Sequence, residues 1–131
     1  MNIKIRLTVL SFMQFFVWGA WYVSMTGWMG TAGLNDLIGW AYTVGPIAAV
    51  ISPFILGVIA DRFFPSQRVL GVLHILGGLA LAGAGYWAAQ WQNGKPPAPE
   101  AGNAPFLNTA HLPFLGLLLL HMLCYMPTLG L

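Results

Sequence analysis

The first long hydrophobic run of the chain carries side chains that can bind a small polar ligand. Gln14, Trp18, Trp21 and Met25 are spaced i, i+4, i+7 and i+11, so they share one face of a helix. The amide both donates and accepts hydrogen bonds, and the indole rings can stack on a flat group. A polar group in a hydrophobic environment needs a partner, which is either a ligand or a neighbouring helix. Gln14, Trp18 and Trp21 are therefore candidate binding residues, with the helix contact as the open alternative.

Two histidines stand alone in later apolar runs. His74 and His121 can each form a hydrogen bond to another helix, or they can act in a polar relay. Their spacing does not fit a metal site, and the sequence holds no Ser/His/Asp order and no phosphate-binding glycine loop. We expect neither an enzyme nor a metal or cofactor site.

A charged segment follows the second apolar run. Gly57 precedes the pair Asp61 and Arg62, and Arg68 comes shortly afterwards. The acid and the base can pair with each other, with a helix terminus or with a partner that moves away. They can equally be interfacial charges that only set the topology.

The composition shows what must position these residues. Of 131 residues, 58% are hydrophobic and 6% are charged, whereas a soluble domain has roughly 25% charged residues. So few charges cannot coat a soluble fold, which places the apolar side chains in lipid. The net charge of +2 comes from scattered basic residues, so no nucleic-acid partner is expected. The single cysteine, Cys124, excludes a disulfide within the chain.

Four apolar runs are long enough to cross a bilayer, which takes about 20 residues. They cover about residues 5–28, 38–60, 69–91 and 112–131, and a Pro-rich loop occupies about 92–111. The chain is therefore predicted to be an all-α integral membrane protein with the bilayer as a partner. The first run begins like a secretory signal, but it is too long for one.

The basic residues predict the orientation. Four of the five fall at the N-terminus or between the second and third runs, which assigns both places to the cytoplasm and the loop at 92–111 to the outside.

Small residues predict close helix packing. Ala41, Gly45, Ala49, Pro53 and Gly57 recur every four residues in the second run, and the third run has Gly78, Ala82, Gly85 and Ala89. Such rows let helix backbones approach each other in lipid.

The segment at 57–62 resembles the signature loop between the second and third helices of the major facilitator superfamily. The chain is further similar to the bacterial nucleoside:proton symporters of that superfamily at residues 5–7, 11–15, 18–21, 45–50, 57–62, 74 and 125–131. The segment after Arg62 departs from the usual pattern, because Phe63 to Gln67 replace the common glycine and basic pair. Arg68 then only takes the place of a later basic residue of the family's loop pattern.

The resemblance implies a twelve-helix transporter in the bacterial inner membrane, of which this chain is the N-terminal part. Its partners would be a nucleoside, a proton and the remaining helices, and it would work by alternating access. Gly57, Asp61, Arg62 and Arg68 would form a conformational latch, while Gln14, Trp18 and Trp21 would contact the substrate. The fourth run reaches Leu131 without a polar stop, which agrees with an incomplete chain.

Two other classes fit the span count. A four-helix accessory or assembly subunit needs no charge within the membrane. A small multidrug exporter needs an acid in its first helix, where this chain has Gln14.

Overall fold

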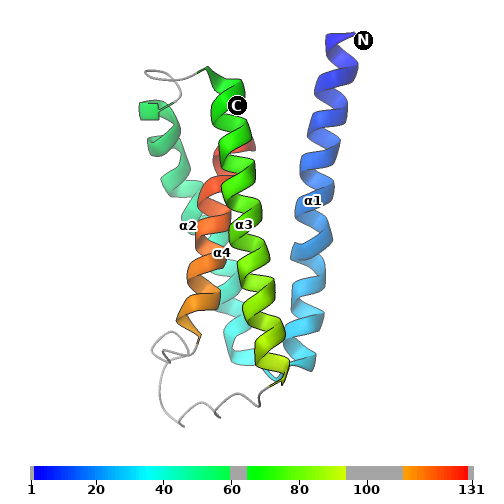
Figure 1. The fold of residues 1–131 in the computed structure, drawn as a ribbon, viewed down its shortest axis with the longest axis vertical. Coiled ribbons are helices and arrows are strands. Elements are labelled where there is room, and N and C mark those ends of the chain that lie inside the picture. Colours follow the sequence, from blue (N-terminus) through cyan, green and yellow to red (C-terminus); the bar gives the residue numbers. More distant parts are fainter. Residues whose placement is uncertain (1, 60–64, 94–110, 130–131) are drawn as a thin grey trace. The chain divides into compact units, whose positions relative to one another are not determined.

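The computed structural model describes residues 2–59, 65–93 and 111–129, and almost all of them are helical (Figure 1). The elements are α1 (Ile3–Thr31), α2 (Asn35–Ile59), α3 (Ser66–Asn93), α4 (Leu112–Tyr125) and the 3₁₀ helix η2 (Met126–Leu129). Four stretches are long and apolar enough to cross a membrane. The prediction of an all-α chain with four long apolar helices is confirmed. The chain forms two compact units, Met1–Ile38 and Gly39–Leu131, which are described in turn.

In the first unit, both ends of α1 are capped by local hydrogen bonds. The Asn2 side chain accepts a hydrogen bond from the backbone N–H of Lys4 at 3.2 Å, which satisfies one donor of the first turn. At the other end Gly33 has φ of +74°, and the backbone N–H of Leu34 donates to the carbonyl of Met29 at 2.9 Å. This is a Schellman motif, which a glycine in the left-handed conformation makes favourable. Met29 and Leu34 are both buried, as the apolar contact of that motif requires.

Helix α2 runs through two prolines without a break in its assigned span. Each proline lacks an N–H and leaves the carbonyl four residues earlier without its helical donor. For Pro53 that carbonyl belongs to Ala49, and the Ser52 hydroxyl donates to it at 3.4 Å. The Ser52 hydroxyl therefore supplies the Ala49 carbonyl with a hydrogen-bond donor in place of the backbone N–H that Pro53 lacks.

The predicted row of small residues on α2 is only half right. Ala41 and Gly45 are buried, but Ala49 and Pro53 are exposed, and nothing is described of the surroundings of Gly57. A repeat of four residues advances by about 40° per step around a helix of 3.6 residues per turn, so the row turns away from any one face. The buried face follows the helical period through Leu37, Ala41, Val44, Ala48 and Ser52.

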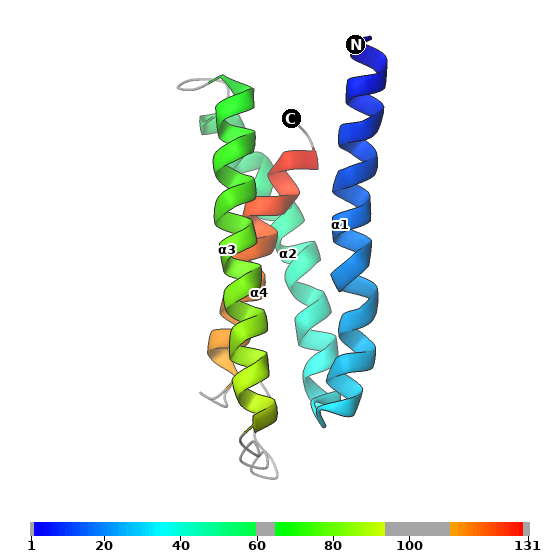
Figure 2. The same cartoon turned by 45° about the vertical axis from the view of Figure 1, so that its right-hand side comes forward.

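In the second unit, α3 and α4 pack side by side in opposite directions (Figures 1 and 2). The order of the contacts along the two helices shows this directionality. The paired residues are Trp87 with Phe114, Gly83 with Leu117, Gly77 with His121, and His74 with Tyr125.

The small-residue face predicted for α3 is wrong. Gly78, Ala82, Gly85 and Ala89 are all exposed, and a Cβ on Gly78 or Gly85 would meet no atom within 4 Å. The buried small residues form the neighbouring row Gly77, Ala80, Ala84 and Ala88. Both rows have small side chains, so composition alone does not choose between them. The large residues of α4, among them Phe114 and Leu118, are buried in the same unit.

The last apolar run is shorter as an α-helix than predicted. Helix α4 ends at Tyr125 instead of continuing to about residue 131, and η2 follows. Pro127 accounts for this change, because it has no N–H to donate to the carbonyl four residues earlier and so cannot continue the α-helical hydrogen bonds. The Thr128 hydroxyl donates to the Tyr125 carbonyl at 2.6 Å, which satisfies an acceptor at the helix end.

Candidate functional site

The candidate binding residues lie on the least exposed face of α1. Gln14, Trp18 and Trp21 are half-buried, and Met25 is buried. We call Gln14, Trp18, Trp21, Tyr22 and Met25 the polar face of α1. It combines an amide, two indole N–H groups and a phenol with a thioether, so most of its members can form hydrogen bonds.

Tyr22 is the member of this face that the sequence analysis missed. Its ring centroid lies 5.4 Å from that of Trp18 and 5.5 Å from that of Trp21. The signal was present in the spacing, because Tyr22 follows Trp18 by four residues and therefore lies one turn along. The structure thus joins Trp18 and Trp21 through a third aromatic ring.

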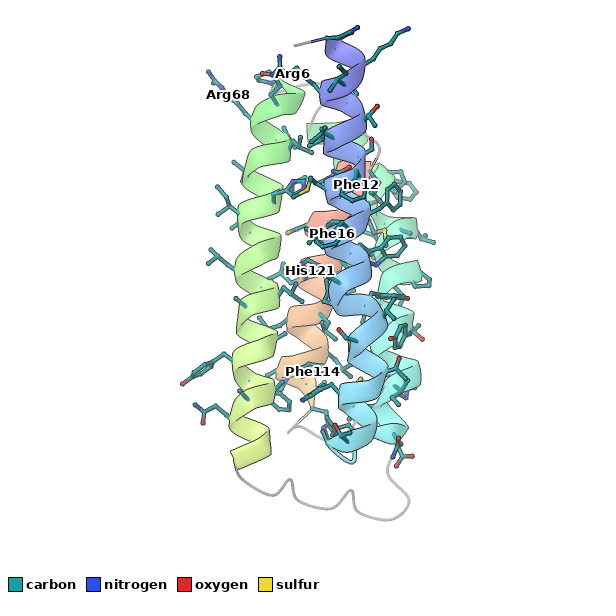
Figure 3. All side chains as sticks on the ribbon, turned by 90° about the vertical axis from the view of Figure 1, so that its right-hand side faces the viewer. Arg6, Phe12, Phe16, Arg68, Phe114 and His121 are labelled. Atoms are coloured by element: carbon teal, nitrogen blue, oxygen red, sulfur yellow. The ribbon has the colours of Figure 1, made fainter. Side chains whose placement is uncertain are left out.

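The opposite side of α1 carries the rings of Phe12 and Phe16, which have no hydrogen-bonding groups. Phe12 and Phe16 stack at 5.9 Å and are 64% and 61% exposed (Figure 3). Plain hydrocarbon rings suit contact with lipid tails, whereas indole and phenol groups in mid-membrane do not. Phe12 and Phe16 therefore lie apart from the polar face, whereas the ring of Phe15 lies 6.2 Å from that of Trp18.

The two histidines have different environments. The His121 ring on α4 is buried, and its Nδ1 lies 2.8 Å from the carbonyl oxygen of Gly77 on α3. A carbonyl only accepts, so Nδ1 carries the proton and donates it across the helix pair. His74 is exposed, and its Nδ1 donates to the carbonyl of Leu70 in its own helix at 2.9 Å. Among the described residues, the predicted hydrogen bond to another helix is formed by His121, whereas His74 bonds within its own helix.

Tyr125 brings the two imidazoles into one cluster. Its ring stacks on His121 at a centroid distance of 5.7 Å, and His74 lies edge-on to it at 6.4 Å. Cys124 is buried beside them, and a Cβ on Gly77 would approach its Cβ to 3.2 Å. The absence of a side chain at Gly77 therefore permits the contact that places His121.

The predicted latch is described only in part. Asp61 and Arg62 lie outside the described residues, and so do residues 94–110 of the predicted loop. Gly57 lies within α2 near its end, and Arg68 is exposed in the first turn of α3. A positive charge at a helix N-terminus opposes the helix dipole. Helix stability therefore does not account for Arg68, whose part in the predicted latch stays a prediction.

His111 lies at the N-terminal boundary of α4 and is buried. Its burial lowers the pKa of the imidazole below the ordinary value of 6.5, because the charged form loses hydration. Within the described ranges, no three potential metal-ligating side chains gather into a site.

Four apolar helices with exposed hydrocarbon side chains define a multi-pass membrane protein. Comparison with known proteins gives the family. The sequence pattern of the nucleoside H+ symporters matches residues 1–93. The chain therefore belongs to the nucleoside H+ symporter family, and the resemblance stated from the sequence is confirmed.

Three relatives illustrate the match. YegT of Escherichia coli (strain K12), which is named as a nucleoside transporter, is 36% identical to this chain over 132 residues. The aligned residues cover 100% of this chain and 26% of YegT. Nucleoside permease NupG of the same organism is 35% identical over 133 residues, or 100% of this chain and 27% of NupG. The xanthosine permease of Escherichia coli (strain K12) is 38% identical to this chain over 95 residues, which cover 68% of this chain and 21% of the permease.

The chain spans about a quarter of the length of YegT and NupG. No solved structure gives a significant match. The relatives are transporters by name, so the comparisons support neither the accessory subunit nor the small multidrug exporter.

Proposed function

We propose that this chain forms the first four helices of a twelve-helix transporter that imports nucleosides together with protons. The observation that carries the proposal is the family membership, together with relatives named for nucleoside and xanthosine transport. Those relatives are about four times as long as this chain, which leaves room for the remaining helices.

The proposed mechanism is alternating access between two halves of the transporter. The N-terminus and the segment between α2 and α3 face the cytoplasm in this scheme, in agreement with the distribution of basic residues. The protein sits in the bacterial inner membrane, where the potential contributes about 2.3 kcal/mol per charge per 100 mV. Proton entry down that gradient drives nucleoside accumulation.

The polar face of α1 is the part of this chain that we assign to the substrate. Gln14 supplies hydrogen bonds to a base or sugar, and Trp18 and Trp21 supply stacking surfaces. Their half-buried positions on the side of α1 opposite Phe12 and Phe16 support this role.

The histidines remain candidates for a polar relay in this scheme. The Nδ1 atoms of His74 and His121 are engaged with backbone carbonyls, so Nε2 of each ring is the atom that would exchange a proton. The clustering of both rings around Tyr125 supports a shared role.

Uptake by the complete gene product tests the proposal. The protein is produced in a strain without nucleoside uptake, and entry of labelled nucleosides, including uridine and xanthosine, is measured with and without a protonophore. We expect uptake that rises as the external pH falls and that the protonophore abolishes. Correct membrane insertion without uptake of any nucleoside would refute the substrate assignment, and uptake insensitive to the protonophore would refute proton coupling.

Asp61→Asn tests the latch of Gly57, Asp61, Arg62 and Arg68. The amide keeps the shape of the side chain but removes the charge that would hold the two halves together. The loss of a charge contact is worth about 1–3 kcal/mol, so we expect a transport rate about tenfold lower at an unchanged amount of protein in the membrane. An unaltered rate would leave Asp61 as a topology signal only.

A further inference from the structure

Tyr22 holds a central position on the polar face of α1. Its ring is tilted by 55° to that of Trp18 and stands at 84° to that of Trp21. The edge-to-face pair of Trp21 and Tyr22 forms a right-angled corner, and Trp18 borders it one turn earlier. All three residues belong to one helix, so a single element fixes the arrangement.

The depth of these rings argues against a role as an interface anchor. Val17 is the central residue of α1, and the helix rises about 1.5 Å per residue. Trp18, Trp21 and Tyr22 thus lie within about 8 Å of the helix centre, which for a helix centred in the bilayer is well inside a hydrocarbon core of about 30 Å. Tryptophan and tyrosine otherwise prefer the membrane surface, where their polar groups reach water.

The chemistry around the corner matches a nucleobase better than a sugar. A flat base can stack on one ring while its edge meets the perpendicular ring, and aromatic stacking is largely independent of base identity. A ribose ring offers no such π-face. Gln14 lies one turn before Trp18, and its amide can donate to and accept from the polar edge of the base.

We propose that Tyr22 is a binding residue of the substrate site, and that Trp18, Trp21 and Tyr22 together bind the base of the nucleoside. The inference rests on the proposed nucleoside transport. It goes further by identifying the base as the part of the substrate that α1 recognises. The ring of Tyr22 is the one that completes the corner. The ribose is then left to other parts of the transporter.

Kinetics of uridine uptake by the complete transporter test this assignment. Tyr22→Leu removes the ring, Tyr22→Phe keeps the ring without its hydroxyl, and Phe16→Leu removes an exposed ring from the same helix. We expect Tyr22→Leu to raise KM for uridine about tenfold, which corresponds to about 1.4 kcal/mol. Phe16→Leu should leave KM unchanged, and Tyr22→Phe should fall between the two.

Competition experiments on the unaltered protein give a second measurement that does not depend on whether a variant folds. Unlabelled uracil should inhibit uridine uptake at lower concentration than ribose does. A separate comparison, made with Tyr22→Leu once its insertion in the membrane has been verified, should show inhibition by uracil weakened in proportion to the change in KM.

The outcomes separate the two proposals. If the unaltered protein takes up no nucleoside, the proposed function fails. If it takes up uridine but ribose competes better than uracil, or Tyr22→Leu and Phe16→Leu have the same KM, only the assignment of Tyr22 is overturned.

Discussion

Helix α1 and the pair formed by α3 and α4 use opposite chemistry on their buried faces. In the pair, small residues such as Gly77 and Ala84 lie buried in the same unit as large residues such as Leu118, and a backbone carbonyl accepts a hydrogen bond from His121. On α1, the least exposed face carries large aromatic and amide side chains instead. Small residues permit backbones to approach, whereas large polar rings keep them apart and offer groups to a ligand.

Under the proposed function, this difference separates residues that build the membrane fold from residues that contact the substrate. Substitutions in the pair should change folding, and substitutions on the polar face of α1 should change transport at constant folding. Four further changes, in order of decreasing effect, test the structural half of that distinction.

Gly77→Leu should have the largest effect on folding. A Cβ at this position already lies 3.2 Å from the Cβ of Cys124 and 3.5 Å from Nδ1 of His121. The rest of a leucine side chain must separate the helices, at a cost of about 1–3 kcal/mol for overpacking in addition to the lost hydrogen bond. We expect less folded transporter and faster maleimide labelling of Cys124, which is otherwise buried.

Gly78→Leu is the matched control, because a Cβ on Gly78 meets nothing within 4 Å. It should leave the labelling of Cys124 as it is in the unaltered protein. Equal labelling in the two variants would show that the row through Gly77 does not form the contact.

Gly33→Val should have the next largest effect, and it acts at the end of α1. Its φ of +74° lies in the left-handed region, which costs a non-glycine residue about 1–2 kcal/mol, and more when the side chain is β-branched. The midpoint of thermal unfolding of the purified transporter should fall. Gly39→Ala is the control, since Gly39 is helical, has no such φ and has open space around it. A Gly33→Val midpoint no lower than that of Gly39→Ala would contradict the Schellman turn.

The helices themselves could be predicted because each apolar run is long enough to cross a bilayer, and a chain in lipid must satisfy its backbone internally. The end of α4 was placed too late because apolar character continues past Tyr125, while Pro127 lacks the N–H that a longer α-helix would need. Hydrophobicity determines that a segment lies in the membrane, and local hydrogen bonding determines where its helix ends.

The faces and contacts were harder to predict. On α3 two adjacent rows consist of small residues, and only the position of α4 selects the row of Gly77. The hydrogen bond from His121 joins residues 44 positions apart, so it depends on the register of two helices and not on either sequence alone. The face of Gln14, Trp18 and Trp21 could be found because it follows from the period of one helix.

His121→Leu should lower stability by about 1 kcal/mol, less than the change at Gly77. Hydrogen bonds between membrane helices contribute about 0.6 kcal/mol on average and at most about 1.7 kcal/mol. His74→Leu removes a hydrogen bond within one helix from an exposed side chain, so it should cost less. Unfolding of the purified transporter in a series of denaturant concentrations measures both. If His74→Leu proved the more damaging of the two, the His121 bond would not be what holds α3 to α4.

The smallest expected effect is a pH dependence from His111, at the boundary of α4. Because burial lowers its pKa in the folded state, the unfolded chain takes up a proton more readily as the pH falls below 6.5. The stabilisation is fully present above pH 6.5, and it is lost as the pH falls towards the lowered pKa. Uptake of one full proton on unfolding would change the free energy of unfolding by about 1.4 kcal/mol per pH unit. A single group with a small pKa shift contributes a fraction of that change. Unfolding midpoints at pH 7.5 and 5.0 should therefore differ more in the unaltered protein than in His111→Gln, which cannot titrate. Equal differences in the two proteins would mean that His111 is hydrated in the folded transporter, and that the N-terminal end of α4 is open to water.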